Sequence, residues 1–357
     1  MRTAKSLLLA TTLLAGTVST AVAEVKVVAS IKPVHSLVAA VMDGVGRPEL
    51  IVEGASSPHT YALKPSQAVM LEEADIVFWI GHELEAFLEK PLETVAAKAK
   101  KVELMDAHGL EKLGFREGGE FDEHDHGDHK EKEHGHDDHK EHEHAEKHDY
   151  EKKHEDERDH AKKDDHHAED KEDAHKHDEH DHHGRHDPHI WLDPVNAKAI
   201  VHEIEEALAN KDPENAAVYE KNAHAVMAQL DALTAEISAD LKSVKAQRFV
   251  VFHDAYHYFE NRFGLKAAGS ITISPEVMPG AERIHEVREH IEHAQAACVF
   301  AEPQFEPKLV ETVVEHSKVR TGVLDPLGVS LQAGAGLYFE LLRGMASSFK
   351  SCLGSAS

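Results

Sequence analysis

Short apolar runs alternate with segments of helical periodicity along most of the chain. In the first half the predicted strands are residues 25–30, 50–53 and 76–81, and the predicted helices are residues 33–42, 65–73 and one that begins at 82. In the second half the predicted strands are residues 249–252, 268–271, 298–301 and 322–324, and the predicted helices are residues 256–263, 281–295, 307–317 and 337–349. Apolar strands that alternate with helices are typical of a parallel sheet covered on both faces. The pattern predicts an α/β fold with two open parallel-sheet lobes.

One segment between the two halves has a different pattern. From residue 215 to 244, apolar side chains recur every three or four residues without interruption. This stripe predicts a single helix of about thirty residues, roughly 45 Å long. We expect a rigid connection, with an N-terminal lobe at 24–210, a linking helix at 211–246 and a C-terminal lobe at 247–357.

The pattern disappears from residue 120 to 187. This segment holds 28 acidic and 12 basic residues, and 19 of the 32 histidines of the chain. It has too few apolar side chains to offset the entropy of ordering, so we expect a disordered insert in the first lobe. Of the net charge of −27, about −16 lies here, and this acidity excludes a nucleic-acid binder that relies on overall basicity.

The histidines of the insert suggest metal capture. Imidazole binds late first-row metals, and nearby carboxylates raise the local concentration of cations. A solvated linker is the alternative, but a linker does not need so much histidine. The expected capture residues are His124, His126, His129, His134, His136, His139, His142, His144, His177, His180, His182 and His183.

The first 23 residues are typical of a secretory signal peptide. Arg2 and Lys5 precede an apolar run at 6–18, and Ala21 and Ala23 give a small-x-small cleavage site. A membrane anchor is the alternative, but the run is short for a span. We expect an exported protein in the periplasm.

Four polar side chains are candidates for a site at the strand ends. His59 and His189 belong to the first lobe, and His253 and Asp325 belong to the second. Ligands of open parallel sheets bind beyond the carboxyl ends of the strands. Three imidazoles with one carboxylate or one water form a tetrahedral zinc set, so this pattern predicts a Zn(II) site between the lobes.

Other chemical signals are weak. His285 and His290 resemble a zinc-protease helix, but they are five residues apart and do not share a face. We expect them, with His293, to lie on a solvated helix face, and His82 and His257 to be surface or supporting groups. His35 could line the cleft, but we do not expect it to be a ligand. The sequence contains no phosphate-binding loop and no nucleophile motif.

The chain has two cysteines, Cys298 and Cys352. In an oxidising compartment they can form a bridge that closes a loop of about fifty residues. Two free buried thiols are the alternative.

Five segments together resemble the periplasmic zinc-binding proteins of bacterial zinc-uptake ABC transporters, in the metal-specific cluster of solute-binding proteins. They are residues 54–66 (GASSPHTYALKPS), 189–194 (HIWLDP), 251–256 (VFHDAY), 300–305 (FAEPQF) and 324–328 (LDPLG). The resemblance covers nearly the whole chain outside the signal peptide and the insert.

The resemblance implies two α/β lobes joined by a long rigid helix, with the metal between them. It implies that His59, His189 and His253 are the zinc ligands, with Asp325 as a fourth ligand or as the neighbour of a water. Manganese-type members tend to have a glutamate where His253 stands, which favours zinc. The resemblance also implies a disulfide between Cys298 and Cys352. Some zinc-type members have an acidic residue directly before the first histidine; in this chain Pro58 occupies that position.

We therefore expect a zinc receptor and not an enzyme. It would bind Zn(II) in the cleft, dock transiently as a monomer on the membrane permease of a zinc ABC transporter, and exchange zinc with periplasmic zinc chaperones. A manganese or iron receptor, a zinc-dependent hydrolase and a periplasmic metal buffer are the alternatives.

Overall fold

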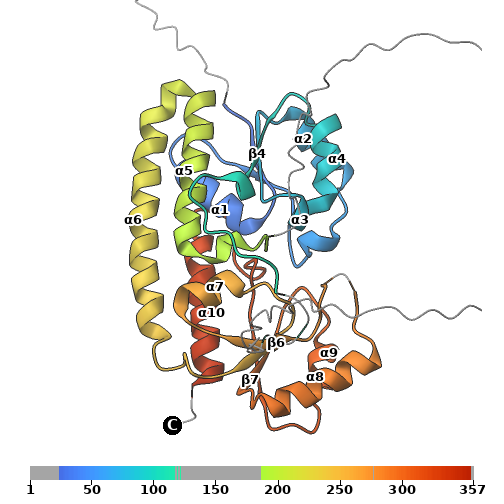
Figure 1. The fold of residues 1–357 in the computed structure, drawn as a ribbon. Coiled ribbons are helices and arrows are strands. Elements are labelled where there is room, and N and C mark those ends of the chain that lie inside the picture. The colour runs from blue at the N-terminus through green and yellow to red at the C-terminus, as the bar shows by residue number, and fades with distance from the viewer. Residues whose placement is uncertain (1–23, 117–118, 120, 122–185, 276, 355–357) are drawn as a thin grey trace, which may run out of the picture. The chain divides into compact units, whose positions relative to one another are not determined.

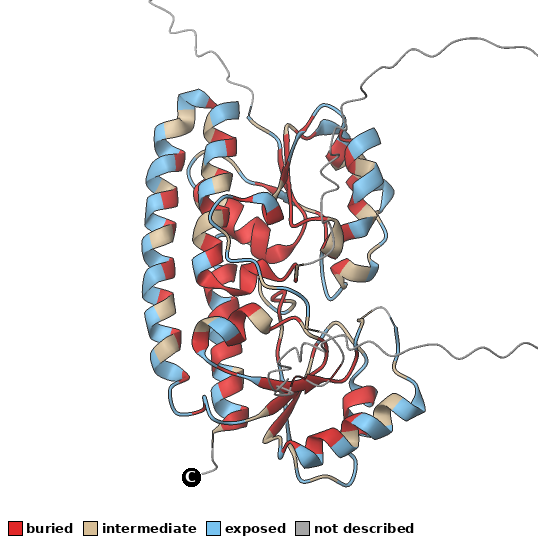
Figure 2. Cartoon of the chain, viewed as in Figure 1, coloured by how far each residue is buried: buried red, intermediate tan, exposed pale blue. Residues whose placement is uncertain are grey.

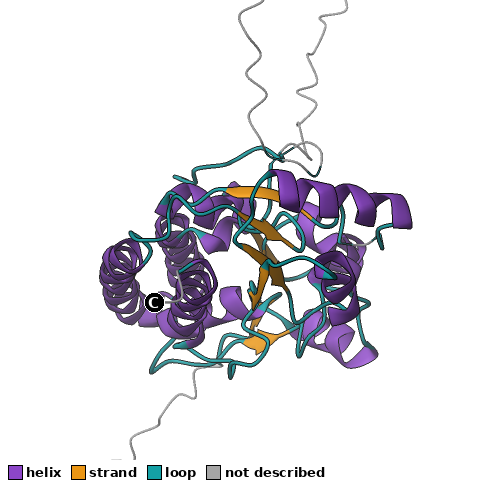
Figure 3. Ribbon diagram, turned by 90° about the horizontal axis from the view of Figure 1, so that it is seen from below, coloured by secondary structure: helices purple, strands orange, loops and turns teal. Residues whose placement is uncertain are grey.

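A computed structural model describes residues 24–116, 119, 121, 186–275 and 277–354 (Figure 1). The predicted signal peptide and nearly all of the predicted insert, including the twelve capture histidines, lie outside the described residues. Two four-stranded parallel sheets lie within one compact unit of the described chain. Figure 3 shows the strands with helices on either side of them. The predicted α/β class with two parallel sheets is confirmed.

The first sheet has the strand order β2-β1-β3-β4. Its strands are β1 (Val27–Ala29), β2 (Glu49–Leu50), β3 (Ile76–Trp79) and β4 (Lys100–Glu103). Every residue of the two central strands, β1 and β3, is buried, which explains why their sequences are continuously apolar. The edge strand β4 begins with two exposed lysines.

The helices of this half are α1 (Lys32–Val41), α2 (Pro65–Glu73), α3 (His82–Glu85) and α4 (Glu89–Thr94). Three 3-10 turns accompany them: η1 (Pro58–Thr60), η2 (Ala86–Leu88) and η3 (Leu104–Asp106). Pro33, Pro58 and Pro65 stand in the first turns of α1, η1 and α2, where the N–H that proline lacks would have no partner within the helix.

The second sheet has the strand order β6-β5-β7-β8. Its strands are β5 (Phe249–Val251), β6 (Ala267–Ser270), β7 (Cys298–Ala301) and β8 (Arg320–Val323). Its helices are α7 (His257–Phe263), α8 (Ala281–His293), α9 (Pro307–Val314) and α10 (Leu337–Leu353).

Successive residues of β5 enter two different cores, because side chains of a strand alternate between its faces. Phe249 packs on Phe349 of α10 in the larger core, and Val250 packs with Val287 of α8 in the smaller one. Helix α10 therefore covers one face of the sheet, and α8 and α9 cover the other (Figure 2).

The long helix α6 (Ala216–Asp240) follows α5 (Pro194–Lys211) and the 3-10 turn η5 (Pro213–Asn215). It packs on α5, on α1 of the first half and on α10 of the second half (Figure 1). Its buried stripe is Tyr219, Ala223, Val226, Leu230, Leu233 and Ile237. At 25 residues, about 37 Å, it is shorter than expected. The domain boundaries given above stay a prediction.

Three features differ from the sequence-based expectations. Strand β4 was not predicted, because its edge position allows a polar sequence. Helix α5 was not predicted either, although Asp193 caps its first turn by accepting a hydrogen bond from the N–H of Val195. The prediction that His290 is solvated was wrong: it is 8% exposed, and its Nε2 lies 2.9 Å from the carbonyl oxygen of Ala268, because this side of α8 packs on β6.

Cys298 and Cys352 form the expected disulfide, which joins the start of β7 to the last turn of α10. Across the described parts of the chain, no helix has the length and apolar character needed to cross a membrane.

Candidate metal centre

Three histidines from separate parts of the chain converge on one point. His59 lies in η1, His189 directly precedes the 3-10 turn η4 (Ile190–Leu192), and His253 follows β5. Each offers a ring nitrogen, and these three atoms lie within 4.8 Å of one another. The ring centroids are 5.4 Å (His59–His189), 5.6 Å (His59–His253) and 5.4 Å (His189–His253) apart.

The space between these rings is small and enclosed by apolar side chains. Its volume is about 10 Å³, which is roughly one water molecule. Leu84 from the first sheet's half and Phe305 from the second line it together with Trp191. His189 and His253 are each 5% exposed. Such a cavity fits a single ion and does not fit an organic ligand.

Two buried carboxylates hold two of the rings. Oδ1 of Asp187 lies 2.7 Å from Nδ1 of His189, and Oε1 of Glu302 lies 2.7 Å from Nδ1 of His253. Each carboxylate also accepts the backbone N–H of the same histidine. When Nδ1 donates its hydrogen to a carboxylate, Nε2 keeps a free lone pair for a metal. Nε2 of His253 is buried and has no hydrogen-bond partner in the described chain.

The pKa values of the three rings follow from this burial. Burial is the main reason why the pKa values of His59 and His189 lie well below the usual value, and the neighbouring imidazoles lower them further. Burial also lowers the pKa of His253, but the Glu302 carboxylate outweighs it, so the net pKa is raised. His59 and His189 are therefore neutral near pH 7, as metal ligands must be.

Asp187 is itself anchored by the chain around it. Its N–H donates to the carbonyl oxygen of Leu113, and its carbonyl oxygen accepts from the hydroxyl of Tyr258 in α7. Burial raises the pKa of its carboxyl to about 7. The chain before the insert, at Leu113, is thus tied to the residue that orients His189.

Asp325 lies apart from the three ring nitrogens. Its carboxylate accepts the backbone N–H groups of Leu327, Gly328 and Val329 and the side-chain amide of Gln304. It does not line the cavity, whereas Gln304 does. Oε1 of Gln304 is buried and has no partner in the described residues. The carboxylate organises the loop that follows β8.

Sequence reasoning gave Asp187, Glu302 and Gln304 no role. Asp187 stands two residues before His189, and Glu302 and Gln304 follow a strand in the same way as His253. Their position after a strand could have marked Glu302 and Gln304 as candidates. Only the folded structure shows that they lie next to the histidines.

Comparison with known proteins gives one consistent family. The family model described as "Zinc-uptake complex component A periplasmic" matches residues 27–352. The chain is 54% identical over 355 residues to the high-affinity zinc uptake system protein ZnuA of Brucella abortus, covering 99% of both chains. It is 35% identical over 331 residues to the protein of the same name from Yersinia pestis, covering 93% of this chain and 92% of that one.

Solved structures support the same fold. A crystal structure of ZnuA matches with a TM-score of 0.67 at 22% identity, covering 92% of this chain and 99% of that one. A zinc-bound ZnuA mutant that lacks residues 138–173 of its own chain matches with a TM-score of 0.64 at 21% identity, covering 93% and 99%. The chain belongs to the family of periplasmic component A proteins of zinc-uptake complexes.

Proposed function

We propose that this protein is the zinc receptor of a high-affinity uptake system, and that His59, His189 and His253 bind one Zn²⁺ directly. The observation that carries the ligand set is the convergence of three ring nitrogens within 4.8 Å, two of them on rings oriented by buried carboxylates. The members of the family are components of zinc-uptake complexes. The protein is therefore a periplasmic transport component and not an enzyme.

For the fourth zinc ligand, the sequence left Asp325 and a water as alternatives. The oxygens of Asp325 already accept four hydrogen bonds, and the residue does not line the cavity. Gln304 does line it, and its buried Oε1 has no hydrogen-bond partner in the described chain. These contacts favour a water that completes the tetrahedron and donates a hydrogen bond to Gln304, with Asp325 holding the Gln304 amide.

The partner of the loaded protein is the membrane permease of the same complex. We propose that the receptor docks on it transiently as a monomer and accepts zinc from the medium or from periplasmic zinc chaperones. For the histidine-rich insert, including the capture residues named above, we propose a helper role in which it gathers zinc at low concentration. Deleting residues 123–182, which hold eleven of the twelve capture histidines, should then slow loading and leave the tight site intact.

The test is a zinc competition titration, with manganese as the second metal, on the exported chain with and without residues 123–182. Single variants His59→Ala, His189→Ala and His253→Ala should each weaken the tight site more than about 100-fold, the upper range for loss of a residue that only supports a ligand. His202→Ala is the matched control, because His202 is an exposed histidine beside Glu205. Asp325→Asn should weaken zinc binding far less than the three histidine variants.

Two outcomes would contradict the proposal. If tight zinc binding disappears together with residues 123–182, the main site lies in the insert. If Asp325→Asn matches the histidine variants in its effect, the carboxylate is a direct ligand and the water is not.

A further inference from the structure

A second group of metal-binding side chains lies at the carboxyl ends of β3 and β4. His82 and Glu83 begin α3, which starts three positions after the end of β3, and Glu103 is the last residue of β4. The two strands are paired neighbours, with Trp79 opposite Glu103. One donor atom from each of the three side chains lies within 4.8 Å of the others, and Nδ1 of His82 is 3.2 Å from Oε2 of Glu83.

Gly81 makes room for this arrangement. A Cβ atom at Gly81 would lie 2.8 Å from Oε1 of Glu103 and 3.4 Å from Oε2 of Glu83. Both carboxylates therefore approach the bare backbone of this glycine. Two carboxylates so close repel each other when both are charged, and a divalent cation between them turns this repulsion into attraction.

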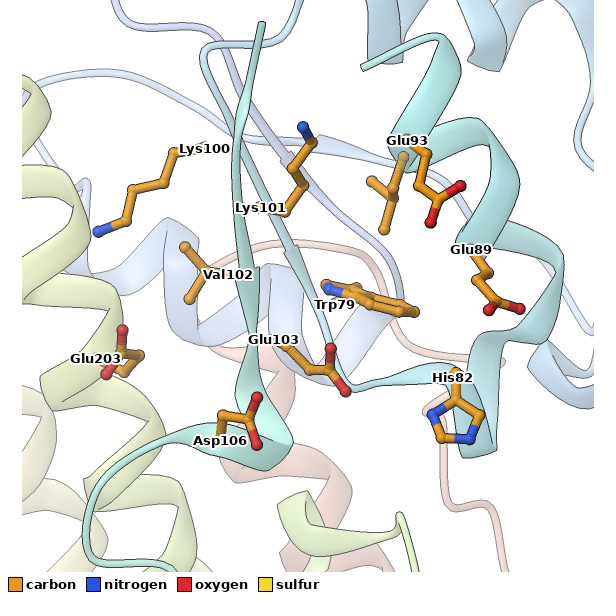
Figure 4. Close-up of a pocket in the computed structure, with 11 residues that line it drawn as sticks. Trp79, His82, Glu89, Glu93, Lys100, Lys101, Val102, Glu103, Asp106 and Glu203 are labelled. Atoms are coloured by element: carbon orange, nitrogen blue, oxygen red, sulfur yellow. The ribbon is translucent and has the colours of Figure 1, made fainter. Parts of the chain in front are cut away.

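Two of the three side chains, His82 and Glu103, line a pocket of about 720 Å³ (Figure 4). Its other acidic lining residues are Glu89, Glu93, Asp106 and Glu203. Trp79 also lines it and is 7% exposed, yet its indole Nε1 has no hydrogen-bond partner in the described chain. An indole N–H cannot bind a metal, but it can donate to a water that a metal holds.

We propose that His82, Glu83 and Glu103 form a second divalent-cation site that takes zinc, separate from the three-histidine centre. One imidazole and two carboxylates suit Zn²⁺, and waters complete its coordination. The side chain of His82 is 37% exposed, so the site is open and exchanges its ion readily, unlike the closed histidine cavity.

The two sites are close neighbours through α3. Leu84 lines the three-histidine cavity, while the adjacent Glu83 belongs to the second group. A zinc ion held by His82, Glu83 and Glu103 would thus lie on the first lobe beside the cleft. This site does not depend on which residues hold the ion in the cleft.

The two tryptophans of the chain report the two sites separately. Trp191 lines the histidine cavity, and Trp79 lines the pocket beside His82 and Glu103. In the full exported chain labelled with ¹⁵N-tryptophan, zinc chloride should shift the Trp191 indole signal at the first equivalent. The Trp79 signal should shift at higher zinc, with its own saturation curve.

Glu103→Gln and His82→Ala should raise the zinc concentration at the midpoint of the Trp79 shift about tenfold or more. Two matched controls should leave this midpoint unchanged: Glu203→Gln, in the same pocket but outside the three donors, and His202→Ala. His253→Ala should abolish the Trp191 response and keep the Trp79 response. This pattern separates failure of the second site from failure of the main one.

The proposal is overturned if zinc leaves the Trp79 signal unmoved, or if Glu103→Gln titrates like the unmodified chain. It is also overturned if His253→Ala removes both responses, because the two clusters would then act as one site.

Discussion

The carboxylates behind His189 and His253 decide how well these rings present their Nε2 atoms. Asp187→Asn and Glu302→Gln keep the shape of each side chain but remove the charge that holds the Nδ1 hydrogen. We expect each variant to weaken zinc binding about 10- to 100-fold, the usual effect of removing such a partner. A chelator competition titration would measure it.

The control for this pair is Asp254→Asn. Asp254 adjoins His253 in sequence, but its carboxylate pairs with Arg116 and bonds to no ring of the centre. If Asp254→Asn weakens zinc binding as strongly as Asp187→Asn, then net charge near the site matters and ring orientation does not.

His35 should make stability depend on pH. It is 8% exposed, its Nε2 lies 3.1 Å from the Pro48 carbonyl oxygen, and burial lowers its pKa below 6.5. As the pH falls through 6.5, the unfolded chain takes up a proton that the folded chain resists. The stability that His35 contributes is therefore complete above pH 6.5 and is lost as the pH falls toward its lowered folded value.

His35→Gln removes this titration. In a chelating buffer, the free energy of unfolding should fall less for this variant than for the unmodified chain between about pH 7.5 and about pH 5, on either side of the ordinary histidine pKa. A difference between the two proteins that stays constant with pH would contradict the assignment.

Among the elements, β7 and α10 are joined by the disulfide. Its sequence separation of 54 gives a loop whose closure contributes about 4 kcal/mol by the chain-entropy model. The double variant Cys298→Ala, Cys352→Ala should lose about this much free energy of unfolding in urea. Its zinc affinity should be unchanged, because the bridge is at the start of β7 and Glu302 follows the other end. Weaker zinc binding would mean that the bridge also positions Glu302.

The elements that could be predicted from sequence are those with one dominant periodicity. The central strand β3 is apolar throughout, and α6 has an uninterrupted stripe, so both were recognised. The edge strand β4 starts with two exposed lysines and carries no such signal, yet it supplies Glu103. An edge strand can be partly exposed to solvent, so its sequence can be as polar as that of a loop.

The site divides in the same way. His59 and His253 were found because each follows a predicted strand, a rule that depends only on topology. His189 follows the insert instead and was found through its segment HIWLDP. The partner Glu302 required a distance between residues that are remote in sequence, because it lies 49 positions from His253. Asp187 lies only two positions from His189, but no pattern in the sequence shows that its carboxylate meets the ring. The nearby cluster of His82, Glu83 and Glu103 required both the unpredicted β4 and the bare backbone of Gly81.

For the molecule as a whole, the two halves are connected by more than the metal. Nζ of Lys32 in α1 donates to the carbonyl oxygens of Gly328, Val329 and Leu331, at 3.1, 2.8 and 3.0 Å. Lys32 is 9% exposed, so these contacts are shielded from water. Hydrogen bonds from a charged donor contribute about 1.5–3 kcal/mol each.

Other buried contacts reinforce this connection. The indole N–H of Trp191 donates to the carbonyl oxygen of Pro326, and the hydroxyl of Tyr338 in α10 donates to the carbonyl oxygen of Trp191. None of these bonds involves the three histidines. The halves are therefore held together in the absence of zinc, with α6 packed along α1 and α10.

Zinc loading should consequently move the halves very little. Crystal structures of the chelator-treated and zinc-loaded protein should agree within about 1 Å over Cα atoms, as for other pre-organised binding surfaces. Lys32→Met keeps the apolar stem but removes the donor, so it should increase hydrogen exchange in residues 325–331 of the metal-free protein. A shift above about 2 Å between the two crystal forms would mean that the halves hinge on loading. Unchanged exchange in Lys32→Met would mean that Trp191 and Tyr338 suffice to hold them.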